Sequence, residues 1–175
     1  VSIHMRNLIV ILLYLTTISW NNKPIEPFEL SLTDYNYSLA YSVIYKLTNE
    51  KLTITFSGEL ENEKDSILYI TNKLPKNKIR KLSNINIDSL SVLYSNSCIL
   101  DGDIKSFEFK KNGITKSITL ENYYHPELSP AIGIINGIVP EKYKMYYNKK
   151  ELIKEMKDCG KFRIIKDWKK YNKEN

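Results

Sequence analysis

Histidine, cysteine and clustered glycine are scarce in this chain, and each scarcity excludes a class of chemistry. The 175 residues include two histidines, two cysteines and six glycines. Because the glycines stand singly, the sequence offers no glycine-rich loop that could cradle a phosphate group. The two cysteines, Cys98 and Cys159, lie far apart, so neither a redox motif nor a zinc-ligand set is predicted. We therefore expect no metal and no other cofactor.

One histidine, His125, lies within the predicted domain, and any histidine-dependent catalysis would have to use it. No Gly-x-Ser-x-Gly motif accompanies it, which argues against a serine-hydrolase triad. His125 precedes Pro126 between a predicted strand and a predicted helix. We interpret it as a residue of a surface turn.

Carboxylates are the remaining candidates for catalysis. Asp101-Gly102-Asp103 looks like a fragment of a calcium loop, but the residues that follow do not supply the further oxygen ligands. We predict a turn there. A glycosidase-type pair depends on distance in space, and nothing in the sequence singles out two of the four candidates, Asp101, Asp103, Glu108 and Glu121. No catalytic residue is assigned.

The N-terminus carries the most informative pattern. A basic residue precedes the apolar run Leu8–Leu15, after which the sequence becomes more polar. This order is typical of a secretory signal peptide, and the run is shorter than the roughly 20 apolar residues of a membrane span. We predict a cleaved signal in residues 1–19, with cleavage before Trp20; residues 1–4 precede a natural initiator, Met5. An uncleaved membrane anchor and a buried core element are the alternatives.

Export would place the protein in an oxidising compartment, periplasmic or extracellular, where paired cysteines form disulfides. A Cys98–Cys159 bond is expected, closing a loop of about 60 residues and stabilising the fold by about 4 kcal/mol in the chain-entropy model. Two separate buried thiols, or a reactive cysteine, are the alternatives.

Alternating apolar residues predict an antiparallel sheet. Every second residue from 37 to 47 is apolar, and a second alternating run begins at Leu52. A turn at Asn49-Glu50 pairs Leu47 with Leu52, Tyr45 with Ile54 and Val43 with Phe56. A second hairpin centres on Asn112-Gly113, which favours a type I′ turn and sets Phe107 opposite Ile118. Further strands are expected at 66–71, 98–100 and 143–147.

Helical patterns lie between these strands and after them. Helices are predicted at 76–83, from Asp88, at 130–139 with Ser129 as N-cap, at 149–158 ending at Gly160, and within 161–171. Residues 20–36 contain two prolines and are predicted to form an extended N-terminal segment. We expect residues 37–175 to be a single α+β domain, a mainly antiparallel sheet packed on one face by helices, ending in a basic helical segment.

The net charge of +6 is concentrated at the C-terminal end. Residues 141–175 contain twelve Lys and Arg against six Asp and Glu, whereas residues 1–140 contain fourteen of each sign. Such a segment suits an acidic partner or an anionic membrane surface; nucleic acid is not expected as the partner of an exported protein. Tyrosines lie before and within it. The predicted binding residues are Tyr123, Tyr124, Tyr143, Tyr146, Tyr147, Lys149, Lys150 and Lys154.

The sequence therefore predicts a small exported module, non-enzymatic and inhibitor- or immunity-like, that binds a protein partner through tyrosines and lysines. An envelope hydrolase that uses carboxylates is one alternative. A membrane-tethered structural protein that retains its N-terminal apolar segment is another. Contact with a membrane is otherwise expected only in passing, through the signal segment.

Overall fold

An eight-stranded sheet is the centre of the structure, a computed structural model that describes residues 24–36, 39–58, 60, 63–99 and 102–174. Its strands are β1 Phe28–Asn36, β2 Tyr41–Thr48, β3 Leu52–Gly58, β4 Ser66–Thr71, β5 Leu93–Asn96, β6 Ile104–Lys111, β7 Ile114–Glu121 and β8 Phe162–Ile165. The helices are α2 Lys76–Ser83, α3 Pro130–Asn136, α4 Lys149–Cys159 and α5 Trp168–Glu174, with short 3-10 turns η2 Ile87–Ser89 and η3 Glu141–Tyr143.

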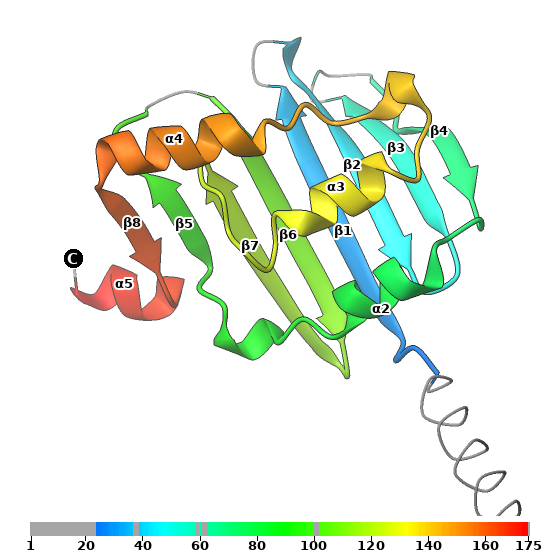
Figure 1. The fold of residues 1–175 in the computed structure, drawn as a ribbon, viewed down its shortest axis with the longest axis horizontal. Coiled ribbons are helices and arrows are strands. Elements are labelled where there is room, and N and C mark those ends of the chain that lie inside the picture. The colour runs from blue at the N-terminus through cyan, green and yellow to red at the C-terminus, as the bar shows by residue number, and fades with distance from the viewer. Residues whose placement is uncertain (1–23, 37–38, 59, 61–62, 100–101, 175) are drawn as a thin grey trace, which may run out of the picture.

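The strands follow the order β4-β3-β2-β1-β6-β7-β5-β8. Every neighbouring pair is antiparallel except β5 with β7, which is parallel. Figure 1 shows α2, α3 and α4 in front of this sheet. The predicted fold class, α+β with a mainly antiparallel sheet, is confirmed.

Both predicted hairpins form in the expected register. Leu47 pairs with Leu52 across the β2–β3 turn, and Phe107 pairs with Ile118 across the β6–β7 turn. The strand at 66–71 and the helix at 76–83 also form as predicted. Helix α4 ends at Cys159 and is capped by the predicted Gly160, whose φ of 64° is the left-handed value that glycine adopts at a helix C-terminus.

The predicted division between an extended segment at 20–36 and a domain that begins at residue 37 is wrong. Residues 28–36 form β1, which lies in the middle of the sheet between β2 and β6. Its alternate residues Phe28, Leu30 and Leu32 are buried in the hydrophobic core with residues of β6, α2 and α3. Pairing with a strand about 80 residues later is a non-local interaction that local sequence does not reveal. The predicted signal segment lies outside the described residues.

Several element predictions after residue 84 are wrong. Only the turn η2 forms near Asp88, with Asn86 as its cap, and residues 93–96 beyond it form β5. Cys98 lies in a turn after that strand, and Leu100 is outside the described residues. Within 161–171, a strand, β8, precedes the last helix, α5, because it pairs with β5.

The segment 143–147 is not a strand but an irregular connection after η3. Two hydrogen bonds to Asn136 hold this connection in place. The Met145 backbone amide donates to the side-chain oxygen of Asn136, and the Asn136 side-chain amide donates to the Met145 carbonyl oxygen, each at 2.9 Å.

Helix α3 ends at Asn136, earlier than the predicted 139. Ser129 precedes α3 as expected, but its hydroxyl accepts from the His125 amide and makes no cap hydrogen bond to the helix.

Cys98 and Cys159 form the predicted disulfide, with their Cα atoms 5.8 Å apart. It joins the turn after β5 to the last residue of α4. Such a bond is compatible with an oxidising, exported location.

Within the described ranges, the structure contains no helix long and apolar enough to cross a membrane.

Candidate functional site

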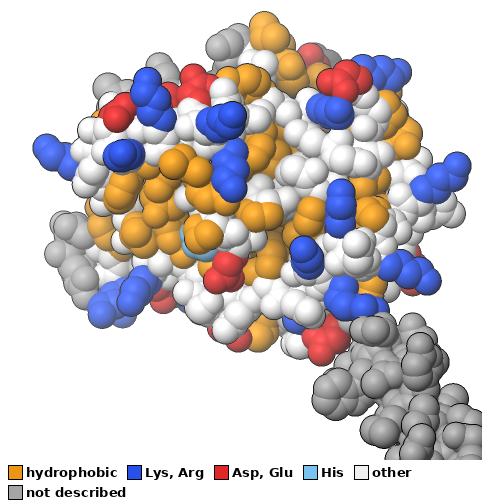
Figure 2. Space-filling model, viewed as in Figure 1, with side chains coloured by type: hydrophobic (Ala, Val, Ile, Leu, Met, Phe, Trp, Pro, Cys, Tyr) orange, Lys and Arg blue, Asp and Glu red, His pale blue; other side chains and the backbone are white. Residues whose placement is uncertain are grey.

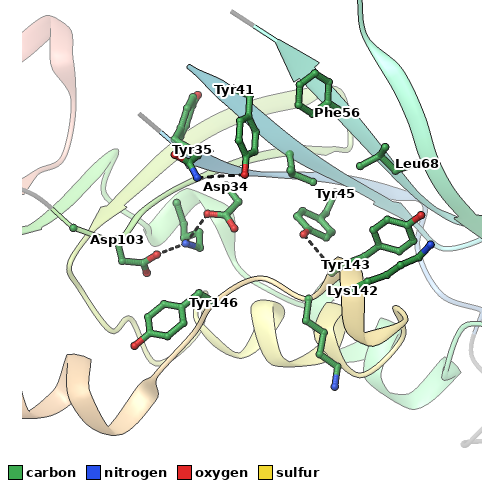
Figure 3. Close-up of a pocket in the computed structure, with 15 residues that line it drawn as sticks. Asp34, Tyr35, Tyr41, Tyr45, Phe56, Leu68, Asp103, Lys142, Tyr143 and Tyr146 are labelled. Atoms are coloured by element: carbon green, nitrogen blue, oxygen red, sulfur yellow. Dashed lines mark hydrogen bonds and ion pairs between the residues drawn. The ribbon is translucent and has the colours of Figure 1, made fainter. Parts of the chain in front are cut away.

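A cleft of about 700 Å³ lies where the core-facing side of β1–β3 meets the segment Lys142–Tyr146; we call it the tyrosine cleft. One wall carries Tyr41 and Phe56, and the other carries Tyr143 and Tyr146 (Figure 3). At this end of the sheet the apolar core gives way to polar side chains. Its volume is in the range of pockets that hold small ligands or single segments of a larger one.

An ion cluster of three residues lies at the inner end of this cleft. Lys105, on the core-facing side of β6, has a side chain only 4% exposed, and its Nζ lies 2.8 Å from Asp34 Oδ1 and also contacts Asp103 Oδ1. The carboxylates are more exposed, at 25% and 21%. The pKa of Asp34 is raised because burial outweighs the attraction of Lys105. The ammonium therefore lies behind two carboxylates that face the cleft.

Aromatic rings are held firmly on both walls. The rings of Tyr41 and Phe56 lie 5.4 Å apart, centroid to centroid. The Tyr45 hydroxyl donates to the Tyr143 carbonyl oxygen at 2.8 Å, which ties the two walls together, and burial raises the pKa of Tyr45. Tyr146 is 70% exposed, and its hydroxyl donates to Glu151 Oε2 at 2.9 Å. Its ring is thus held at the mouth of the cleft without being buried.

A second surface lies beside α4 and β8. The Tyr123 ring lies 5.5 Å from those of both Tyr94 and Phe162, and Ile164 pairs with Tyr94 across the strands. Phe162 and Ile164 are 42% and 49% exposed. We call Tyr94, Tyr123, Phe162 and Ile164 the aromatic patch. Figure 2 shows hydrophobic side chains gathered around the histidine on this face.

Helix α4 carries exposed lysines, one of which lies over Tyr124 beside the aromatic patch. Lys149 Nζ lies 4.8 Å above the ring of Tyr124, within cation–π distance. Lys150 and Lys154 are exposed on the same helix. This arrangement, aromatic rings with a charged rim, is typical of protein contact surfaces.

His125 is buried, so its interpretation as a surface-turn residue is wrong. Its Nδ1 accepts hydrogen bonds from the Glu127 and Leu128 amides at 3.2 and 3.3 Å, and its ring lies 4.5 Å from that of Tyr94. Burial lowers its pKa, although Glu127 opposes the shift. The imidazole thus supports the turn before α3 in its neutral form.

The structure divides the predicted binding residues between two places. Tyr143 and Tyr146 line the tyrosine cleft, whereas Tyr123, Tyr124 and Lys149 lie at or beside the aromatic patch. Tyr147 is half-buried, and burial raises its pKa to about 12, although a hydrogen bond with Ser129 opposes the shift.

Sequence reasoning missed Asp34, Lys105, Tyr41 and Phe56. A signal was present: Asp34 continues the alternation of Leu30 and Leu32, and Lys105 continues that of the apolar β6 residues. A carboxylate and an ammonium at apolar positions of two strands indicate a buried ion pair. Their partnership followed only once β1 was known to pair with β6, where Asp34 stands opposite Lys105.

Of the candidate carboxylates that the structure describes, Asp103 alone lies in the tyrosine cleft. Glu108 forms an ion pair with Lys110 at 2.9 Å and Glu121 with Arg163 at 3.4 Å; Asp101 is outside the described residues. In the part of the chain that the structure describes, no three His, Cys, Asp or Glu side chains are grouped to hold a metal ion.

No protein-family model, curated protein or solved structure matches the chain.

Proposed function

We propose that the protein is an exported, non-enzymatic module that binds a protein partner through the aromatic patch and the lysines of α4. The observation that carries the proposal is the exposure of Phe162 and Ile164, 42% and 49%, directly beside the packed rings of Tyr94 and Tyr123.

We further propose that residues 28–174 act as one domain with its helices on one face of the sheet, and that the N-terminal signal is cleaved on export to the periplasm or beyond.

The patch has the features of a binding hot spot. Its rings are already fixed by one another, so little side-chain entropy is lost when a partner covers them. Aromatic side chains of this kind contribute most of the affinity in many interfaces. We propose that Lys149, Lys150 and Lys154 of α4 supply the positive charge beside it, so the fitting partner has an apolar projection flanked by carboxylates.

The test is capture by the mature protein, tagged at its C-terminus, from native envelope and culture fractions. Wild-type protein should retain one partner in stoichiometric amount. Phe162→Ala should weaken its binding about 30-fold, the usual effect of losing a hot-spot ring worth about 2 kcal/mol.

The matched control is Ile67→Ala, which removes an apolar side chain that is 65% exposed on β4, at the opposite edge of the sheet. Capture that both variants weaken equally, or that neither weakens, would remove the aromatic patch from the mechanism.

The hydrolase alternative has one observation in its favour, the presence of Asp34 and Asp103 in one cleft. Both carboxylates contact the same Lys105 nitrogen. Acid–base hydrolysis of a glycoside requires one protonated and one free carboxyl group with a sugar or water between them. Here both carboxylates are held by one buried ammonium group, which disfavours a protonated acid beside a free base, so we favour binding over cleavage.

A further inference from the structure

We infer that the tyrosine cleft is a binding site for a neutral, hydroxyl-rich ligand, a short oligosaccharide. The inference is separate from the proposed protein contact, because the cleft and the aromatic patch share no residue. It rests on three properties of the cleft: the acceptors at its inner end, the charge of its lining and the placement of its rings.

The inner end of the cleft presents acceptors that are only partly used. Asp34 and Asp103 each contact Lys105 through Oδ1 and remain 25% and 21% exposed. An ionised carboxylate has about four acceptor positions, so capacity remains for donors from a ligand. Lys105 behind them fixes their positions, so the acceptors are pre-organised before the ligand arrives. The ligand must therefore bring O–H or N–H donors.

The charge of the lining favours an uncharged donor. Two aspartates and three lysines line the cleft, Lys142 and Lys144 standing with Tyr143 on the outer wall. Lys144 is itself paired with Glu141, and Lys142 Nζ lies 4.7 Å from the Tyr143 ring centroid. A cationic ligand would compete with Lys105 and meet these lysines, whereas an anionic ligand would face the two carboxylates. A hydroxyl group meets neither penalty.

The aromatic rings select a sugar among uncharged donors. A pyranose has apolar C–H faces and hydroxyl edges, so it can lie against rings while its edge reaches acceptors. Figure 3 shows Tyr41 and Phe56 on one side of the cleft and Tyr146 on the other, with Asp34 and Asp103 between them. The 70% exposure of Tyr146 leaves its ring face available. The lining therefore matches both kinds of surface that a sugar presents.

The site extends beyond a single ring. A smaller cavity of about 190 Å³ shares Gly102, Asp103 and Tyr146 with the tyrosine cleft. The two hollows meet at the Tyr146 ring, whose position is fixed by its hydrogen bond to Glu151. A linear oligosaccharide that passes Tyr146 would occupy both.

The experiment is a printed array of neutral oligosaccharides, including α- and β-glucans, xylans and chitin fragments, with acidic glycans and short peptides on the same slide. The strongest neutral binder is then titrated calorimetrically against wild-type protein and variants. Tyr146→Ala should weaken binding about tenfold, because it removes one stacking ring. Trp168→Ala is the matched control, since it removes a ring that is 46% exposed on α5.

Asp34→Asn should also weaken binding, and its thermal unfolding curve shows whether it folds. If it does not fold, Tyr146→Ala still decides the question, because the side chain that it removes is 70% exposed. The inference is overturned by binding to no neutral glycan, by binding confined to acidic glycans or peptides, or by an affinity that Tyr146→Ala leaves unchanged. Recovery of the sugar intact, by mass spectrometry, is expected; cleaved sugar would overturn the assignment as a binding site.

Discussion

Lys105 is the residue on which the tyrosine cleft depends most. Its side chain is 4% exposed and pairs with two carboxylates, Asp34 of β1 and Asp103 directly before β6. Burying such a charge is costly unless it is paired, and removing one partner leaves the others uncompensated. The same three residues therefore stabilise this end of the sheet and shape the proposed sugar site.

Replacing Lys105 by Met keeps the apolar stem and removes the charge. The free energy of unfolding should fall by about 3 kcal/mol, because Asp34 and Asp103 then face each other without a cation. Urea denaturation measures the change. The control is Lys46→Met, since Lys46 is 49% exposed and lies 2.7 Å from Glu29; an exposed pair should contribute less than about 1 kcal/mol. Equal effects in the two variants would contradict this account of Lys105.

His125 gives the fold a dependence on pH. In the unfolded chain a histidine has a pKa of about 6.5, whereas burial lowers the pKa of His125 in the folded protein. Between these two pKa values the unfolded chain binds more protons, so stability is present at neutral pH and is lost as the pH falls below about 6.5. Protonation would also end the two hydrogen bonds that Nδ1 accepts.

The measurement is the urea midpoint of wild-type protein and of His125→Asn across this pH range. Asparagine can accept at a similar position and does not titrate. The wild-type midpoint should fall more steeply with decreasing pH than that of the variant. Parallel pH profiles would show that His125 is not the titrating group.

At the scale of elements, the disulfide adds a covalent link at the end of the β5–β8 ladder, at one edge of the sheet. Strand β8 pairs only with β5 among the described strands, and α4 buries one residue, Leu152. Cys98 and Cys159 fasten these elements across a sequence separation of 61 residues. Because the bond lies after a short strand and at a helix end, it restrains the segment that carries the aromatic patch.

Removing the bond should therefore lower stability substantially. The chain-entropy model gives about 4 kcal/mol for a loop of this length, and measured values are often nearer 2. The Cys98→Ser/Cys159→Ser variant, compared by denaturation with oxidised protein, measures the loss. Wild-type protein in reductant should match the variant, which should itself be insensitive to reductant. An unchanged midpoint after complete reduction would contradict this role.

Elements that pair with a neighbour in the sequence could be predicted, whereas elements that pair with a distant segment could not. The β2–β3 and β6–β7 hairpins could be predicted because each pairs with its neighbour in the chain and buries alternate residues. The short strands β5 and β8 could not, because four residues carry little periodicity and their pairing joins segments about 70 residues apart. The same limit applies to the sites. Tyrosines were noticeable as a residue type, but the Asp34–Lys105 pairing required the β1–β6 register.

At the scale of the whole molecule, α4 borders both surfaces. Glu151 holds Tyr146 at the mouth of the tyrosine cleft, while Lys149 covers Tyr124 beside the aromatic patch. The positive charge of the last 35 residues is carried in part by this helix and by the elements after it. For the proposed partner, this charge is expected to raise the rate of encounter with an acidic surface more than it affects the fold.

We propose above all that a protein partner binds at the aromatic patch. The most direct test is the dissociation constant of the captured partner, measured calorimetrically for wild-type protein, Phe162→Ala and Ile67→Ala. We predict a dissociation constant about 30-fold higher for Phe162→Ala and unchanged for Ile67→Ala. Equal affinity of all three proteins for the partner, each folded by circular dichroism, would contradict the claim.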